Sequence, residues 1–265
     1  MSTPQDVYAD LIEEGDDIDR LVADLGPAQW ILPTPSPGWT IGHQVAHLAF
    51  VAHLAGLAAA DPDAFTAHAA DAKADFQGAV DAALAEYLAD PQETVVARWR
   101  GEQRAAAEAL AAVPAGQTVP WLVNPLPPSV LAAAGLMELF AHGQDIADAL
   151  GVRREYTDRI GHIVFFGAHT RDFGYAAHGI KPPEEAFRFE ITAPSGTEWG
   201  FGPADAKNKV SGPAVDFCLL VTRRRHRDDL DLVATGEEAE RWLGIAQAYR
   251  GPAGAGRTPG QFAAV

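Results

Sequence analysis

The sequence predicts a fold of the α plus α/β class, with a helical N-terminal part and a smaller α/β C-terminal part. Apolar residues recur at helical spacing as far as Ala177. The segment His178–Pro183 then breaks this pattern, because it contains a glycine and ends in two prolines. Directly after it, Phe187–Thr192 alternates apolar and polar residues, which is typical of a half-buried strand. The 265 residues are enough for two modest domains, and we expect them to cover residues 1–180 and 181–265.

In the first part, helices are expected wherever the apolar spacing continues without proline. Pro33–Gly38 holds three prolines, which lack the amide donor that a helix needs, so it must be a loop, and Thr40 can cap the helix that follows. That helix is rich in alanine and leucine and apolar on more than one face, so it should pack on several neighbours. Val119–Pro128 is a second loop interrupted by prolines, and Gly151 marks the end of the long helix after it. The expected helices cover residues 4–25, 41–59, 63–88, 91–113, 129–150 and 159–177.

The second part is expected to open with a β-hairpin. Pro194–Gly196 supplies turn residues between the strand Phe187–Thr192 and a second strand, Thr197–Phe201. A helix, a strand and a further helix are then expected over residues 213–223, 230–234 and 237–249, before a glycine-rich tail.

The composition is that of a globular protein with a strongly acidic balance. Twenty basic and 36 acidic side chains give a formal charge of −16, which repels nucleic-acid phosphates and anionic lipid surfaces. We therefore expect no nucleic acid and no membrane as a partner, and we expect the basic run Arg223–Arg227 to pair with acidic neighbours. The N-terminus lacks a basic region followed by an apolar stretch, and no segment approaches the roughly 18 apolar residues of a membrane span, so a cytoplasmic location is expected. Cys218, the single cysteine, lies in an apolar run and should be a small buried hydrophobic residue.

Two side chains on one expected helix suggest a metal site. Glu138 and His142 are four residues apart, so they project from one face of the helix and can bind one ion. Carboxylate oxygen and imidazole nitrogen suit zinc or a neighbouring divalent metal, and a facing helix is the best source of a third ligand. His47 is the natural candidate, because its apolar surroundings are otherwise awkward for a histidine. His43 and His47 are also four residues apart and form a competing pair, and Glu-x-x-x-His pairs often lie on solvated helix faces.

Two segments carry a family resemblance. Residues Pro37–Leu48 read PGWTIGHQVAHL, and residues Leu136–Gly151 read LMELFAHGQDIADALG. Both resemble the DinB superfamily, and more closely its actinobacterial branch related to mycothiol-dependent maleylpyruvate isomerase, and the likeness covers nearly the whole chain. The resemblance implies a DinB-like four-helix bundle followed by a small sterol-carrier-protein-like α/β domain. It also implies that His47, Glu138 and His142 bind a divalent metal, with zinc as the first choice among zinc, nickel, iron and manganese.

The function implied by the resemblance is activation of a low-molecular-weight thiol. Three protein ligands leave a coordination position open, and a thiol bound there, mycothiol in the relatives, would be deprotonated and would attack an electrophilic carbon. We therefore expect S-transfer to, or isomerisation of, a small electrophilic metabolite, by a monomer or a homodimer. Two alternatives stay open. One is a thiol-independent cyclase, lyase or hydrolase that uses the metal as a Lewis acid, and the other is a non-enzymatic metal- or ligand-binding protein.

Four further residues are candidates for roles near the metal. His43 is a candidate proton shuttle, although a surface or supporting histidine is the commoner case at such a position. Asp145, one turn beyond the ligand histidine on its helix, either orients an imidazole or is an ordinary helix carboxylate. Trp121 and Asn124 lie on the loop before the same helix, where they could line the mouth of a substrate pocket, and Trp121 could instead fix that loop to the bundle.

Two departures from the family pattern concern the expected wall of the pocket. Relatives often carry an arginine three positions before the metal-binding glutamate and a tryptophan two positions after it. Gly135 and Phe140 occupy these positions here, and both are candidates for contact with the substrate. Loss of an arginine removes an anchor for an anionic substrate, so the substrate is expected to differ from that of the relatives.

Overall fold

The computed structural model describes residues 6–262, and for residues 71–74 and 76 it describes the backbone without the side chains. Pro4, where the first helix is expected to begin, lies outside the described residues. The chain divides into two compact units, Met1–Arg153 and Arg154–Val265. Each unit has its own core, and each is described by itself.

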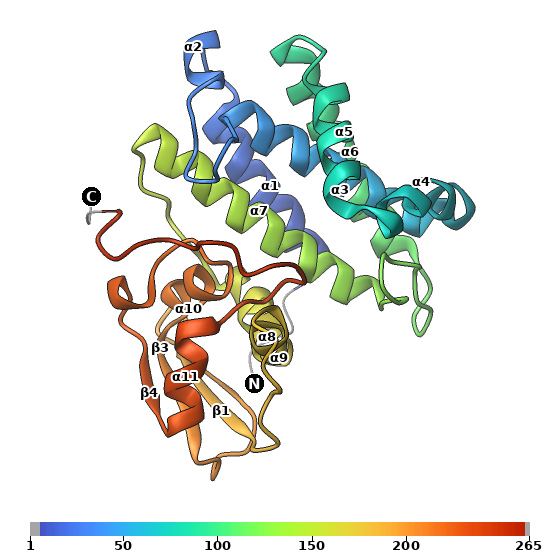
Figure 1. Cartoon of the computed structure of the whole chain (residues 1–265). Coiled ribbons are helices and arrows are strands. Elements are labelled where there is room, and N and C mark those ends of the chain that lie inside the picture. The colour runs from blue at the N-terminus through green and yellow to red at the C-terminus, as the bar shows by residue number, and fades with distance from the viewer. Residues whose placement is uncertain (1–5, 263–265) are drawn as a thin grey trace. The chain divides into compact units, whose positions relative to one another are not determined.

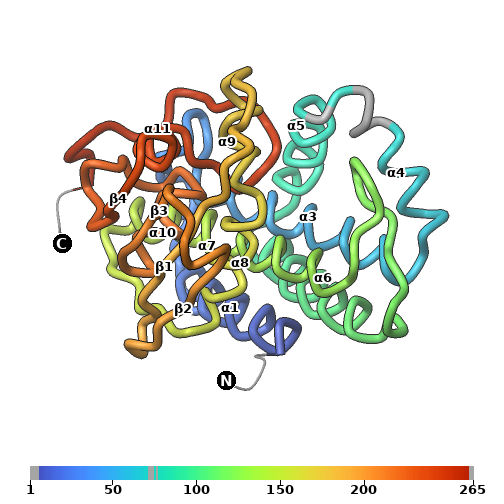
Figure 2. The backbone as a smooth tube through the Cα atoms, turned by 90° about the horizontal axis from the view of Figure 1, so that it is seen from below, coloured from blue at the N-terminus to red at the C-terminus, as the bar shows by residue number. Residues whose placement is uncertain are grey.

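The first unit is a four-helix bundle with three shorter helices packed on it. Helices α1, α3, α6 and α7 pack against one another; Figure 1 shows α1 beside α7, and Figure 2 shows α3 beside α6. Helices α2, α4 and α5 all pack on α3, which is therefore central, as expected from its apolar faces. The helices are α1 (Val7–Val22), α2 (Pro27–Trp30), α3 (Ile41–Ala60), α4 (Pro62–Ala74), α5 (Phe76–Tyr87), α6 (Gln92–Ala112) and α7 (Pro128–Leu150).

Local sequence determines where α3 and α7 begin and end. At the start of α3, the hydroxyl of Thr40 lies 2.8 Å from His43 Nδ1, and the backbone N–H of Thr40 donates to the same nitrogen at 3.3 Å. Helix α7 begins with Pro128, whose fixed φ and missing amide suit a first turn. It ends at Gly151, which has a φ of 66°, a value that glycine adopts without strain.

The single helix expected over residues 63–88 is two helices, α4 and α5. Asp75 interrupts it with an extended backbone, at φ −147° and ψ 91°, and its carboxylate accepts a hydrogen bond from the backbone N–H of Gly78 at 2.9 Å. Aspartate at this position caps the second helix and so stabilises the break. The expectation of one helix is wrong here because the helical apolar spacing continues across the cap.

Helix α3 is long and apolar enough to cross a membrane by length and composition alone. However, 61% of the apolar window is buried inside the protein. The central helix of a bundle passes the same test, so this property is accounted for by the packing of α3 on its neighbours.

The second unit is built on a mixed four-stranded sheet with the order β2-β1-β3-β4. β1 (Phe187–Thr192) pairs antiparallel with β2 (Glu198–Phe201), which confirms the expected hairpin. β3 (Asn208–Pro213) pairs parallel with β1 and antiparallel with β4 (Val233–Thr235). Strand β3 is not predicted by the alternation of its residues, because Val210 is its single large apolar side chain.

The core of the second unit lies between this sheet and two helices, α10 (Ala214–Val221) and α11 (Glu237–Ile245). The ring of Phe189 on β1 lies 5.7 Å from that of Phe217 on α10 and 5.3 Å from that of Trp242 on α11, between ring centroids. Cys218 is fully buried in this core, as expected.

The boundary between the compact units differs from the expected one at residue 180. The helix expected over residues 159–177 is three shorter pieces, η1 (Asp158–Ile160), α8 (Gly161–His169) and α9 (Asp172–Ala177). Helices η1 and α8 pack on α10, and α9 packs on α11, so all three belong to the second unit. Helical periodicity does not reveal which core an amphipathic helix joins, so the sequence does not assign these three pieces to a unit.

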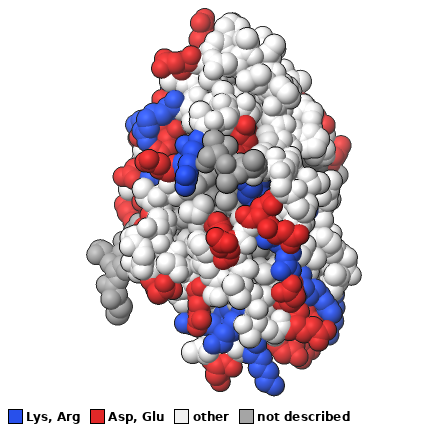
Figure 3. All heavy atoms as spheres, turned by 90° about the vertical axis from the view of Figure 1, so that its left-hand side faces the viewer, with Lys and Arg blue, Asp and Glu red and all other residues white. Residues whose placement is uncertain are grey.

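Charged side chains on the face drawn in Figure 3 are interspersed, with Lys and Arg beside Asp and Glu.

Within the basic run Arg223–Arg227, Arg227 pairs with Glu240 at 2.8 Å. The guanidinium of Arg225 lies over the ring of Phe262, 4.0 Å from its centroid. Pairing of this run with acidic neighbours is thus confirmed at Arg227.

Replacement of Phe189 by alanine should destabilise the second unit by about 3–5 kcal/mol, because it removes a buried ring from the contact of the sheet with both helices. Denaturant unfolding followed by circular dichroism measures this loss. Phe165→Ala is the matched control, since Phe165 keeps 46% of its surface exposed, and it should cost less than about 1 kcal/mol. Equal losses in the two variants would contradict the assignment of the core.

Candidate metal centre

Three side chains from α3 and α7 converge on one point in the first unit. Glu138 and His142 lie one turn apart on α7, and His47 faces them from α3. Nε2 of His142 lies 3.1 Å from Oε2 of Glu138, and Nε2 of His47 lies 3.4 Å from the same oxygen. One ligand atom from each residue lies within 4.8 Å of the other two. The structure therefore brings together the three residues that the resemblance implies as ligands.

The spacing of these atoms fits a divalent metal. With metal–ligand bonds of about 2.0–2.1 Å, tetrahedral geometry separates neighbouring ligand atoms by roughly 3.3 Å. The observed separations of 3.1 and 3.4 Å match that edge. The side chains of His47 and His142 are 10% and 11% exposed, whereas that of Glu138 is 28% exposed, so the cluster can be approached on the carboxylate side.

A chain of hydrogen bonds determines which nitrogen of His142 carries the proton. The carbonyl oxygen of Trp39 can only accept, so the hydroxyl of Thr34, at 2.9 Å, must donate to it. The Thr34 oxygen in turn accepts from the side-chain amide nitrogen of Gln44 at 2.8 Å. The amide oxygen of Gln44 then faces Nδ1 of His142 at 2.5 Å, and this nitrogen must be the donor.

The consequence is that Nε2 of neutral His142 presents a lone pair to Glu138. Two acceptors at 3.1 Å repel unless a proton or a metal cation lies between them. Burial acts to raise the pKa of Glu138, but when the two imidazoles are protonated their hydrogen bonds and positive charge outweigh burial and hold this pKa well below its ordinary value. The carboxyl is therefore ionised beside a positive charge, and an ionised carboxylate with two imidazole nitrogens is a donor set that suits a divalent ion.

Trp39 covers the two histidines. Its ring stacks on that of His142 at 5.8 Å between centroids with an angle of 22° between the planes, and it lies 5.2 Å from that of His47. Nδ1 of His47 is buried and has no hydrogen-bond partner among the described residues. The tryptophan therefore shields one side of the cluster from water, and the tautomer of His47, unlike that of His142, is not determined by a protein hydrogen bond.

The two candidates for catalytic roles are placed in supporting positions. His43 belongs to the cap of α3 through Thr40, and its partial burial lowers its pKa. Asp145 is fully buried, and its Oδ2 accepts a hydrogen bond from Ser36 Oγ at 2.7 Å. This bond ties the loop that carries Trp39 to α7.

One of the four candidates for substrate contact lines a cavity. Gly135 borders a cavity that also reaches Glu138. Phe140 is fully buried and is not among the described residues that line this cavity. The ring of Trp121 stacks on that of Phe65 at 5.6 Å, which attaches its loop to the bundle, and Asn124 is exposed on the same loop.

Gln44, Thr34 and Trp39 were not predicted as site residues, although all three lie in or beside the segment that carries the family resemblance. The available signal was Gln44 itself, a polar residue in an apolar helix, which when buried must find hydrogen-bond partners. Its partners come from a loop and from another helix, so sequence spacing alone cannot identify them.

Comparison with known proteins places the cluster inside a family domain. The family model described as mycothiol maleylpyruvate isomerase N-terminal domain matches residues 11–147, more than half of the chain and all three cluster residues. A second model, described as wyosine base formation, matches residues 183–235. Two uncharacterized proteins from two strains of Mycobacterium tuberculosis are each 44% identical over 257 residues, which is 97% of this chain and 100% of theirs.

Two solved structures share the fold. The crystal structure of the mycothiol-dependent maleylpyruvate isomerase matches with a TM-score of 0.52 at 15% identity, and that of a histidine-to-alanine mutant matches with 0.54 at 14%. Each comparison covers 81% of this chain and 86% of the other. At this identity the likeness is one of fold.

Replacement of Gln44 by leucine should release His142 from its single tautomer. Nitrogen NMR of the metal-free wild-type protein, at a pH where the imidazole is neutral, should show Nδ1 of His142 protonated and Nε2 unprotonated. Gln44→Leu should populate both tautomers, whereas Gln44→Glu keeps an acceptor and should preserve the wild-type one. Loss of such a supporting bond should also weaken metal binding by about 10–100-fold. Protonation of the wild-type residue at Nε2 would show that the hydrogen-bond chain is wrongly assigned.

Proposed function

Because the chain belongs to the mycothiol maleylpyruvate isomerase N-terminal domain family, we propose that it is a divalent-metal-dependent enzyme that activates a low-molecular-weight thiol. The thiol proposed is mycothiol, and the reaction is S-transfer to, or isomerisation of, a small electrophilic metabolite. The observation that carries the proposal is the convergence of His47, Glu138 and His142 with the lone pair of His142 directed at the carboxylate. Three protein ligands characterise catalytic rather than closed structural sites.

Each residue of the site has a defined task in this proposal. His47, Glu138 and His142 would hold the ion, which when bound lowers the pKa of a thiol or water and so supplies a nucleophile at neutral pH. Gln44 keeps the imidazole of His142 in the ligating tautomer. Trp39 excludes water from the histidine side, which leaves the carboxylate side for the substrate.

Use of an external thiol is supported by the family and by the state of the single cysteine. The matched family description and the fold relatives both name mycothiol. Cys218 is fully buried in the second unit, so it is a poor nucleophile for an incoming substrate. For the second unit we propose a sterol-carrier-like α/β domain, on the support of its mixed sheet and the two helices packed against it.

The purified protein should bind one zinc ion per chain, and His142→Ala and Glu138→Gln should each weaken the affinity by more than about 100-fold. Competition with a chelating dye measures this. His53→Ala is a matched control, because His53 also lies on α3 and contacts a carboxylate, that of Glu102, at 3.1 Å, but outside the three-residue cluster. An unchanged zinc affinity in His142→Ala would contradict the assignment of these residues as metal ligands.

Mycothiol should change the absorption spectrum of the cobalt-loaded protein, with a new sulfur-to-cobalt charge-transfer band. Mycothiol methylated on its sulfur cannot form a thiolate and should leave the spectrum unchanged, which makes it the control. If the free thiol leaves the spectrum unchanged while cobalt is bound, the thiol part of the proposal fails. Turnover undiminished in thiol-free buffer would favour the Lewis-acid alternative instead.

A further inference from the structure

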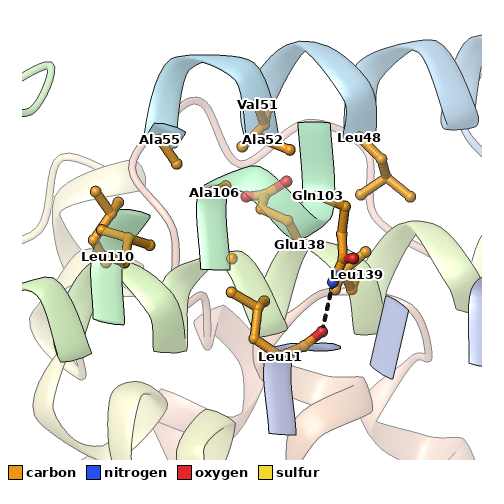
Figure 4. A pocket seen from close by; sticks show the side chains of 12 residues that line it. Leu11, Leu48, Val51, Ala52, Ala55, Gln103, Ala106, Leu110, Glu138 and Leu139 are labelled. Atoms are coloured by element: carbon orange, nitrogen blue, oxygen red, sulfur yellow. Dashed lines mark hydrogen bonds between the residues drawn. The ribbon is translucent and has the colours of Figure 1, made fainter. Parts of the chain in front are cut away.

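A small cavity lies inside the first unit, between α1, α3, α6 and α7. It measures about 40 Å³, and leucine, valine and alanine side chains from these helices form most of its wall (Figure 4). A water molecule needs about 10–15 Å³, and apolar cavities of the interior stay dry and take apolar guests. The cavity therefore has room for more than one water and walls that favour an apolar occupant.

The cavity and the metal cluster share Glu138. Of the two polar residues in the described lining, Gln103 is already engaged, since its amide donates to the carbonyl oxygen of Leu11 at 2.9 Å. The other is Glu138, whose carboxylate points from α7 toward α3, where Val51 and Ala52 lie (Figure 4). A group seated in the cavity thus lies next to the ligand atoms.

The surroundings of the cavity disfavour an anion. None of the described lining residues is basic. Residues 1–153 contain six Lys and Arg against 21 Asp and Glu, a formal charge of −15 for the bundle. Four of these arginines pair with carboxylates, in the pairs Arg20–Asp17, Arg98–Glu86, Arg100–Asp19 and Arg104–Asp16. A carboxylate that entered the cavity would lose its hydration without gaining a positive partner.

We propose that this cavity is a substrate subsite that receives an uncharged, apolar group, a short aliphatic chain, while the reacting atoms stay at the Glu138 end. The proposal rests on the metal-dependent function proposed above and adds the class of its substrate, an electrophile with an apolar tail and without a carboxylate on that tail.

Gly135 sets the space available to this chain. A Cβ at this position would meet only Leu11, with its Cδ1 at 3.4 Å, so a larger side chain can be accommodated and would occupy the cavity. Gly101 on α6 offers the matched control, because it is exposed and a Cβ there would meet nothing within 4 Å. Both substitutions replace a helical glycine by alanine and so raise helix propensity alike.

Xenon binding to the metal-free protein tests the cavity independently of the metal. NMR under xenon pressure should shift the methyl resonances of Leu11, Val51 and Leu110, which line the cavity. The shifts should shrink in Gly135→Ala, disappear in Gly135→Leu and stay unchanged in Gly101→Ala. Absence of these shifts in the wild-type protein would contradict the proposed subsite and show that the cavity is only a packing defect.

Short thiols, bound to cobalt through their sulfur, serve as probes of whether the cavity takes an apolar chain beside the metal. From ethanethiol to butanethiol, each added methylene should tighten binding about fourfold until the cavity is full; Gly135→Ala should reduce this gain and Gly135→Leu should abolish it. Propanethiol should bind at least tenfold more tightly than 3-mercaptopropionate, its carboxylate-bearing counterpart; equal or reversed affinities would overturn the proposal. If xenon occupies the cavity but no thiol perturbs cobalt, the thiol function fails while the apolar cavity stands.

Discussion

The hydrogen bond between His142 Nδ1 and Gln44 Oε1 is the contact on which the candidate site depends. It joins the two helices that carry the ligands, and it directs the lone pair of Nε2 toward Glu138. A buried amide in an apolar helix destabilises the fold unless both its ends are satisfied. Thr34 satisfies the other end of the amide, so the bond that orients the ligand is itself oriented by the loop before α3.

Two hydrogen bonds attach that loop to the bundle, and together they hold Trp39 over the cluster. Thr34 connects the loop to α3 through Gln44, and Ser36 connects it to α7 through Asp145. Trp39, between these anchors and α3, is held over both histidine rings. The prolines around them restrict the backbone of the loop, which reduces the conformational entropy lost when the loop becomes ordered. The proline-rich loop therefore holds the ring of Trp39 rigidly over the cluster.

The sequence predicts the parts of this site that depend on local geometry. Four-residue spacing places Glu138 and His142 on one helix face, and glycine and proline mark the limits of α7. The spacing does not determine whether His47 or His43 faces Glu138 and His142, because that choice depends on how α3 is rotated against α7. The family resemblance is what identified His47. The orientation of the Gln44 amide depends on three segments at once, and the break at Asp75 is hidden by continuous periodicity. The place of α8 and α9 in the second unit is hidden for a related reason, since their periodicity is the same in either unit and only packing assigns them.

Charge is distributed unevenly between the two units, and this bears on what the bundle can bind. Residues 154–265 contain 14 basic and 15 acidic side chains, so nearly all of the net charge lies in the bundle. One carboxylate and two neutral imidazoles leave a divalent ion with a net positive charge, which would be the main attraction for an anion in an otherwise negative unit. A thiolate can use that attraction because its charge sits on the ligating atom. A charge several bonds away would lie instead among Leu11, Val51 and Ala52, where no cation compensates its desolvation. The site therefore favours a ligand whose negative charge lies on the atom that binds the metal, and disfavours one whose negative charge lies on the chain in the cavity.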